Sequence, residues 1–246
     1  MENEAAASAT TSSSGHIVTH HSHLNSTMKA FTAVLIVVIA ALATAADLPT
    51  QIHIALAGQT PEGDSNTMAI SWHTEGNTAT STVKYGTTPG VYSNTASGAS
   101  KAYYETYNHH AVLGALQPAT TYYYIVGDDS AGWSTERTFR SAPLSSTLRG
   151  NFSFFVFGDL GVVNGDPTLD YINANKDSVS LVWHGGDVSY ADDSFLHKGC
   201  VTEFCFEKTF DEYMDKAQPW ASVLPYMVTP GNHEAGMLAM MLCCFW

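Results

Sequence analysis

The stretch FSFFVFGDLG, residues 152–161, is an apolar run that ends in a Gly-Asp pair. The same pattern returns twice. The run at 179–184 leads to Gly186-Asp187-Val188-Ser189-Tyr190, and the run at 226–229 leads to Gly231-Asn232-His233-Glu234. Near-continuous apolar runs of this kind are typical of parallel strands that are buried on both faces. We therefore interpret 152–234 as strands of one parallel sheet, each followed by polar side chains.

Helical patterns separate the three runs. Residues 166–172 include Pro167 near a helix start, and residues 206–221 carry a stripe of apolar side chains at helical spacing, namely Phe206, Phe210, Tyr213, Met214 and Ala217. In such an α/β sheet, ligands bind beyond the carboxyl ends of the strands. Asp159, Asp187 and Asn232 fall at those ends, and Tyr190 lies three residues after Asp187. Because carboxylate, amide and phenol oxygens are hard ligands, this edge is predicted to hold a metal site.

The region before this sheet has a different pattern. Residues 51–57, 68–72, 81–85, 122–126 and 136–140 read as short strands, and no helical period occurs between 47 and 143. Trp72 in an early strand, and a segment at 116–122 typical of a tyrosine corner, resemble a fibronectin type III β-sandwich. We interpret His109 and His110 as loop or strand-edge residues without a functional role.

The amino-terminal residues predict export. Met28-Lys29 precedes a 17-residue apolar run, residues 30–46, with a small-residue end at Ala43-Thr44-Ala45 or Thr44-Ala45-Ala46, which is typical of a secretory signal peptide at 28–46. Residues 1–27 read as a disordered extension. The protein is expected to be secreted, without a stable membrane anchor if the signal is cleaved. The alternative is a signal-anchored membrane protein, if residues 1–27 are really translated.

Two further features fit an exported chain. Asn151 begins an Asn-Phe-Ser acceptor sequence for glycosylation. Cys200 and Cys205 could close a small disulfide loop, and free thiols are the alternative.

The net charge of −13 argues against a nucleic-acid partner, which would require a basic face. The same charge implies that an anionic substrate would need bound cations in the site.

The three clusters together resemble the calcineurin-like metallophosphoesterases, and within them the purple acid phosphatases of plant type. The wider superfamily has a histidine where this chain has Gly161, and the purple acid phosphatases carry a tyrosine at the position of Tyr190. The resemblance covers residues 47–234. It implies a fibronectin type III-like β-sandwich at 47–145, followed by an incomplete α/β metallophosphoesterase domain at 146–234.

The resemblance also implies roles for the site residues and a reaction. Asp159 resembles a ligand of Fe³⁺, Asp187 the bridging carboxylate, and Tyr190 the tyrosinate that colours the centre. Asn232 resembles a ligand of the second, divalent metal, which would be zinc, manganese or iron. His233 is similar to the catalytic histidine that contacts the phosphate and helps to protonate the leaving group. The implied activity is the hydrolysis of phosphate monoesters, and the resemblance leaves a homodimer possible for the full-length family.

The chain departs from the family pattern after Glu234. The family has two further clusters, Val-x-x-His and Gly-His-x-His, whereas residues 235–246 contain no histidine and read as an aberrant tail. The expectation is a carboxyl-terminally truncated acid phosphatase with weak or no activity, whose half-sheet leaves an open edge and uncovered faces. His184 is expected to support the site rather than to bind metal. The alternative function is a non-catalytic secreted β-sandwich binding module; Tyr190 and Gly161 argue against a phosphodiesterase.

Overall fold

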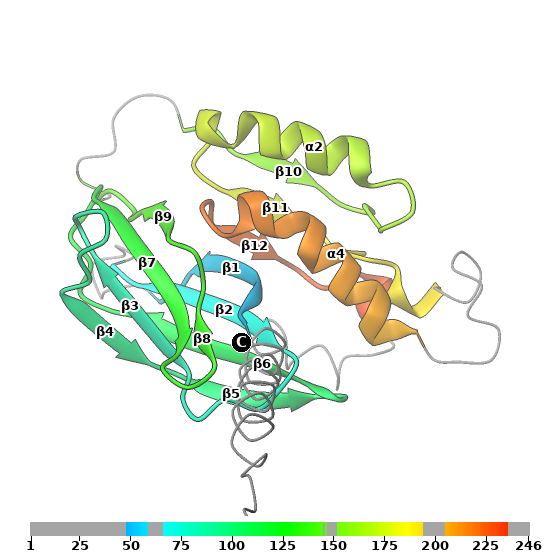
Figure 1. The fold of residues 1–246 in the computed structure, drawn as a ribbon. Helices are drawn as coiled ribbons and strands as arrows, with labels where there is room; N and C mark the ends of the chain where they lie inside the picture. Colours follow the sequence, from blue (N-terminus) through cyan, green and yellow to red (C-terminus); the bar gives the residue numbers. More distant parts are fainter. Residues whose placement is uncertain (1–47, 59–65, 145, 147–151, 194–204, 236–246) are drawn as a thin grey trace, which may run out of the picture. The chain divides into compact units, whose positions relative to one another are not determined.

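The computed structural model describes residues 48–58, 66–144, 146, 152–193 and 205–235. The first part is a β-sandwich (Figure 1). One sheet has the antiparallel order β1-β2-β6-β5, and its strands are β1 (Thr50–Leu56), β2 (Met68–Thr74), β6 (Thr106–Leu113) and β5 (Ala99–Tyr103). We call it the first sheet.

The second sheet has the order β4-β3-β7-β8, and β9 pairs with β7. Its strands are β4 (Asn94–Ser97), β3 (Thr82–Gly86), β7 (Thr121–Asp128), β8 (Gly132–Trp133) and β9 (Arg137–Arg140). Alternate side chains of both sheets form one buried core around Trp72 and Tyr124. The fibronectin-like sandwich is therefore confirmed, and the five predicted strands correspond to β1, β2, β3, β7 and β9.

The tyrosine corner predicted at 116–122 is present. The backbone N–H of Gln117 donates a hydrogen bond of 2.9 Å to the hydroxyl oxygen of Tyr122. The Tyr122 ring is buried and stacks on Phe139 with ring centroids 5.5 Å apart. The corner thus fixes the loop before β7 to the core of the sandwich.

The interpretation of His109 and His110 as loop or edge residues is wrong. Both lie in β6, which pairs with β2 on one side and β5 on the other. His109 faces the core, stacks on Trp72 and hydrogen-bonds to the hydroxyls of Thr74 and Ser81, each at 2.8 Å. Because these hydroxyls satisfy both ring nitrogens, a polar residue is tolerated in a central strand.

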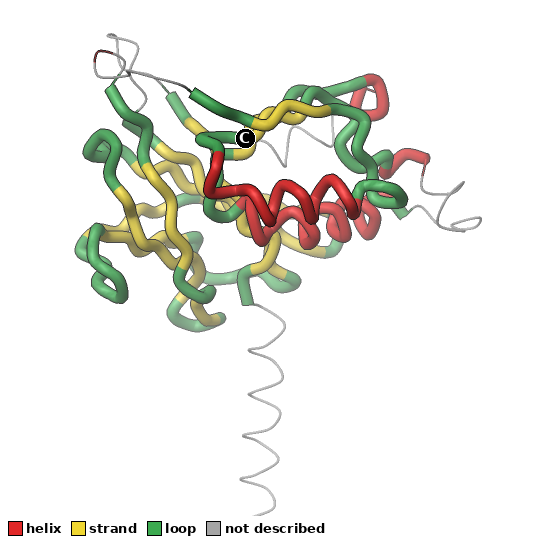
Figure 2. The backbone as a smooth tube through the Cα atoms, turned by 90° about the horizontal axis from the view of Figure 1, so that it is seen from above, coloured by secondary structure: helices red, strands yellow, loops and turns green. Residues whose placement is uncertain are grey.

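The second part is a parallel sheet in the order β10-β11-β12, with strands β10 (Phe155–Phe157), β11 (Val182–His184) and β12 (Tyr226–Val228). Its helices are α2 (Asp166–Asn175), α4 (Phe206–Ala221) and the short α5 (Asn232–Ala235), with 3₁₀ turns η2 (Lys176–Ser178) and η3 (Ala191–Asp193). Figure 2 shows the two longer helices beside the strands. The alternation of strand and helix predicted from the sequence is confirmed.

One face of the parallel sheet is buried and the other is open. Phe155, Phe157 and Val182 belong to or pack against the core formed with α2 and α4. Val156 and Trp183, which pair in register on the opposite face, are 68% and 47% exposed. The prediction of a sheet buried on both faces is therefore wrong for the described residues, and the expected uncovered face is present. The apolar runs of the sequence include side chains on both faces of the sheet, but α2 and α4 cover one face only.

Helix α4 connects the two parts. It packs against β1, and its Gln218 side-chain oxygen accepts a hydrogen bond of 2.9 Å from the backbone N–H of Ile52. The buried Tyr124 hydroxyl donates to the backbone oxygen of Ser222 at 2.6 Å. Tertiary hydrogen bonds thus hold the sandwich against the end of α4.

Several predictions lie outside the described residues: the extension at 1–27, the signal peptide at 28–46, Asn151 and the tail after Ala235. Cys205 is disulfide-bonded, and Cys200 is outside the described residues. In the part of the chain that the structure describes, no helix is long and apolar enough to cross a membrane.

Candidate metal centre

The loops that follow β10 and β11 run side by side beyond the sheet edge. The backbone N–H groups of Asp159, Leu160 and Gly161 donate in turn to the carbonyl oxygens of Gly186, Asp187 and Val188 at 3.1–3.2 Å. These bonds continue the parallel pairing past the last strand residues. They bring the two predicted carboxylates to the same edge, as the sequence predicted.

Three of the predicted ligands have left-handed backbone conformations. The φ angles are 55° at Asp159, 51° at Asp187 and 52° at Tyr190. A non-glycine residue in this region costs on the order of 1 kcal/mol. Such residues cluster where a site requires a particular side-chain direction. Here the strain falls on the three residues whose side chains the sequence analysis assigned to one metal.

Tyr190 points back toward the first loop. Its hydroxyl donates a hydrogen bond of 3.0 Å to the Oδ1 atom of Asp159. Burial, this bond and the negative charges of Asp159 and Asp187 raise the pKa of Tyr190 to about 12. Two carboxylates and one phenol therefore converge, and they would favour a cation between them.

Gly161 leaves room for the Tyr190 ring. It has a φ of 67°, and a Cβ atom added to it would lie 3.2 Å from Cδ2 of Tyr190. A larger side chain at position 161 would need the same space. The absence of a histidine at this position and the presence of Tyr190 are thus two parts of one arrangement.

Asp187 is buried and is held by the third loop. Its Oδ1 atom accepts a hydrogen bond of 2.9 Å from the backbone N–H of His233. A Cβ atom on Gly231 would collide with the Asp187 carboxylate. Glycine at position 231 is therefore required for the third loop to approach this close.

Glu234, for which the sequence predicted no role, joins the loop that follows β11 to the loop that follows β12. Its buried carboxylate accepts hydrogen bonds from the backbone N–H groups of Asp187, Val188 and Gly231 at 2.8, 2.9 and 2.7 Å. The bond to Gly231 is the Glu half of a capping box, because Glu234 is the third residue of α5 and Gly231 precedes that helix. The spacing from Gly231 to Glu234 was a signal that could have identified it.

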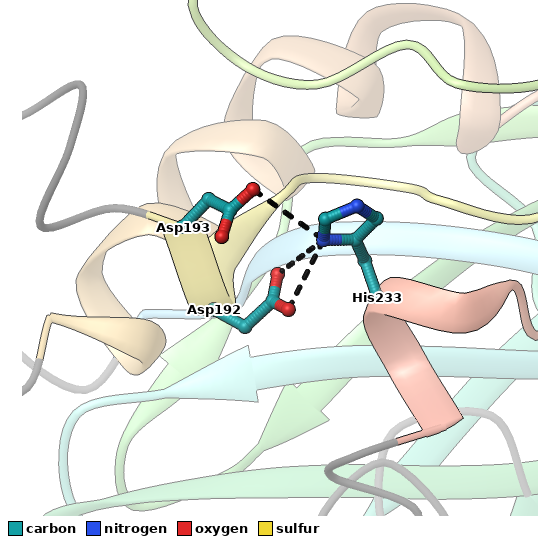
Figure 3. A group of neighbouring side chains, drawn as sticks. All are labelled: Asp192, Asp193 and His233. Carbon is teal, nitrogen blue, oxygen red and sulfur yellow. Dashed lines mark hydrogen bonds and ion pairs between the residues drawn. The ribbon is translucent and has the colours of Figure 1, made fainter.

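His233 lies against two aspartates of η3 (Figure 3). Its Nδ1 atom is 3.0 Å from Oδ1 of Asp192 and 3.6 Å from Oδ2 of Asp193. Burial lowers the pKa of His233, but the Asp192 hydrogen bond and the charges of Asp192, Asp187 and Asp193 outweigh it and raise the pKa. The sequence did not predict a role for Asp192 and Asp193, because two aspartates in a loop after Tyr190 form no distinctive sequence motif.

The group Asp192, Asp193 and His233 has ligand atoms within 4.8 Å of one another, a spacing that could hold a metal ion. The His233 ring also lies 4.2 Å from the Tyr190 ring, centroid to centroid. Through His233, this group therefore contacts Tyr190 of the predicted metal centre. Asn232 is the first residue of α5, directly before His233, and its side chain is exposed.

His184 lies behind the ligand loops, as predicted for a supporting residue. It is fully buried, and its Nδ1 atom is 2.7 Å from the Tyr226 hydroxyl and 3.1 Å from the Tyr213 hydroxyl. Burial lowers the pKa of His184 to about 4. A neutral imidazole in this network connects the end of β11 to α4 and β12.

The donor set fits a hard cation. Its described members are carboxylate and phenol oxygens of Asp159, Asp187 and Tyr190, and the like charge that raises the pKa of Tyr190 is the charge that a bound cation would compensate. The described residues of this edge thus offer a set of hard oxygen donors for one cation.

Comparisons with known proteins show what the chain is similar to. Residues 49–141 match the family model described as purple acid phosphatase, N-terminal domain. Purple acid phosphatase 18 of Arabidopsis thaliana is 37% identical over 193 residues, and acid phosphatase type 7 of Danio rerio is 31% identical over 196. Each match covers 76% of this chain but only 38% and 40% of the relative.

A solved structure has the same fold. The purple acid phosphatase PPD1 from yellow lupin (Lupinus luteus) seeds superposes with a TM-score of 0.60 at 21% identity, over 76% of this chain and 36% of the lupin chain. The present chain therefore spans about two-fifths of the length of the relatives that it matches. Residues 49–141 are thus a purple acid phosphatase N-terminal domain, and over 76% of its length the chain is similar to plant purple acid phosphatases.

Proposed function

We propose that this chain supplies the carboxylate and phenolate half of a binuclear centre that hydrolyses phosphate monoesters. The observation that carries the proposal is the convergence of Tyr190 and Asp159 at 3.0 Å, beside the buried Asp187, at the carboxyl edge of a parallel sheet. The family relationship supports the same reaction. Fe³⁺ would be held by Asp159, Tyr190 and Asp187, and a divalent zinc, manganese or iron ion by Asp187 and Asn232.

The ions would supply positive charge for the substrate phosphate and would acidify a bound water. The protein residues have separate tasks. Asp187, whose carboxylate is fixed by the backbone N–H of His233, would be a ligand of both ions. His233, whose pKa is raised, retains a proton at mildly acid pH. It is therefore suited to donate that proton to the leaving-group oxygen of a phosphate ester.

We further propose that the 246 residues alone turn over slowly or not at all. In the described part of the site, Asp192 and Asp193 already engage the Nδ1 atom of His233. Each metal would thus lack the imidazole ligands that the family resemblance implies. We also propose that the protein acts outside the cell, because the amino-terminal sequence is typical of a secretory signal.

Metal stoichiometry tests the proposal directly. The purified chain would be dialysed against Fe³⁺ and Zn²⁺, and bound metal and p-nitrophenyl phosphate hydrolysis would be measured at acid pH. We expect at least one bound Fe³⁺ that is lost in Asp159→Asn and kept in Asp170→Asn, whose aspartate is exposed on α2. Equal binding by both variants would exclude the assigned site.

A further inference from the structure

A cavity of about 280 Å³ lies between the first sheet of the sandwich and helix α4. Its floor is the outer face of that sheet. Ile52, Trp72 and Ala111 belong to the sandwich core, and alternate residues of a strand face opposite sides. His53, His73 and His110 are therefore on the outer face, where they line the cavity.

Strand register arranges these side chains in rows. His53 pairs with Ser71, which pairs with His110. In the neighbouring row His73 pairs with Asn108, which pairs with Lys101. These two rows of polar side chains form the floor of the cavity. Helix α4 contributes Phe210, Asp211 and Met214 to the lining.

Buried polar atoms of this lining without a hydrogen-bond partner among the described residues include one on the sheet and one on α4. One is Nε2 of His73, whose residue is 3% exposed, and the other is Oδ1 of Asp211. Leaving a buried polar group without a partner costs about 1–3 kcal/mol. Both atoms belong to residues that line the same cavity.

The charges around the cavity select the kind of molecule. Asp211 also lines an adjoining hollow together with Glu75, Glu207 and Asp215, so the surroundings are negative and disfavour an anion. Burial lowers the pKa of His73 and of His110, and both rings are therefore neutral at pH 7. In the described part of the chain, the His, Cys, Asp and Glu side chains grouped at metal-ligand spacing are Asp192, Asp193 and His233, and none of them lines this cavity.

A hydroxyl group matches both unpaired atoms. It can donate to the carboxyl of Asp211 when that group is ionised and accept from it when it is protonated, and it can either donate to or accept from a neutral ring nitrogen. Phe210 and Met214 offer apolar surface for the carbon side of such a molecule. We propose that this cavity binds a small neutral polyhydroxylated molecule of monosaccharide size, with hydroxyl groups on His73 and Asp211. This site is separate from the metal centre.

The test uses the full chain, four neutral probes (D-glucose, D-mannose, D-galactose and glycerol) and two charged probes (putrescine and inorganic phosphate). Binding would be measured by titration calorimetry and by saturation-transfer NMR. We expect saturable binding of at least one sugar. We expect it to weaken about tenfold or more in Asp211→Leu and in His73→Phe, which remove one unpaired polar atom each. Asp170→Asn, on the exposed surface of α2, should bind as the wild type does.

Thermal unfolding of each variant shows whether it is folded, and binding is compared only between folded variants. Two variants are used so that misfolding of one leaves the other to decide. Saturable binding that both folded variants retain would overturn the proposal, as would the absence of binding by all four neutral probes. Tighter binding of putrescine or inorganic phosphate than of any sugar would overturn the assignment of a neutral polyol.

Discussion

The carboxylate of Glu234 accepts a hydrogen bond of 2.8 Å from the backbone N–H of Asp187. Through this bond the helix that carries His233 is fixed to the loop that carries the proposed bridging carboxylate. The same carboxylate also binds the N–H groups of Val188 and Gly231. One buried acid thus maintains the spacing between two of the three ligand loops.

Replacement of Glu234 should therefore destabilise the protein. Glu234→Ala leaves three backbone donors without their acceptor, and we expect a loss of roughly 3 kcal/mol in the free energy of unfolding. Urea denaturation monitored by circular dichroism measures this loss. Asp170→Ala, at an exposed position, is the control and should change stability by less than about 0.5 kcal/mol. A change in Glu234→Ala as small as in the control would show that the carboxylate does not join the loops.

Gly161 and Gly90 form a matched pair for a second prediction. Both have positive φ angles, of 67° and 69°, but only a Cβ atom on Gly161 would touch Tyr190, whereas one on Gly90 would meet nothing within 4 Å. Alanine should cost about 1 kcal/mol at either position because of the left-handed conformation. Only Gly161→Ala should in addition displace Tyr190 and weaken Fe³⁺ binding. Calorimetric titration with Fe³⁺ separates the two effects, and unaltered affinity in Gly161→Ala would count against the packing argument.

The tyrosine corner allows a third prediction. Tyr122→Phe removes the acceptor of the Gln117 N–H and should destabilise the sandwich by about 1 kcal/mol. Tyr92→Phe removes a hydrogen bond to Glu136 at the exposed surface, and its effect should be near zero. Thermal unfolding of both variants measures the difference. Equal midpoints for the two variants would show that the corner contributes no stability.

Asp211 gives a prediction about pH. Burial raises the pKa of Asp211 to about 7, and Glu207, Asp215 and Glu75 add to this, against the hydrogen bond from Gln51. The carboxyl of the unfolded chain ionises near pH 4, but the folded protein holds the proton to about pH 7. Below pH 4 the group therefore has no effect on stability, and its cost grows as the pH rises from 4 to 7.

Asp211→Asn should remove this cost. Because the carboxylate is only partly buried, we expect a gain of roughly 2 kcal/mol at pH 8 and almost none at pH 3.5. Urea denaturation at both pH values measures it, with Asp170→Asn as the control. A gain of equal size at both pH values would mean that the effect does not come from ionisation of Asp211.

Local sequence signals predicted much of this structure. The corner at Tyr122, the apolar runs of the parallel strands and the stripe on α4 are each encoded within a few adjacent residues. Strand β6 was missed because His109 and His110 interrupt its apolar pattern. Their burial depends on hydroxyls of Thr74 and Ser81, about 30 residues away. Propensity cannot report partners at such a distance.

At the candidate site the sequence predicted the three loops but not what surrounds them. The Gly-Asp pairs placed Asp159 and Asp187 at one edge, because parallel strands end there together. The engagement of His233 by Asp192 depends on how η3 and α5 approach each other, which no local pattern encodes. The open face at Val156 and Trp183 likewise reflects which helices are present to cover it.

The central claim is that Tyr190 and Asp159 share a ferric ion. The most direct measurement is the visible absorption of the chain after addition of Fe³⁺. A tyrosinate–iron charge-transfer band should appear, vanish in Tyr190→Phe and persist in Tyr171→Phe, whose ring is exposed on α2. A band of equal intensity in Tyr190→Phe, or no band in the iron-loaded wild-type chain, would contradict the account.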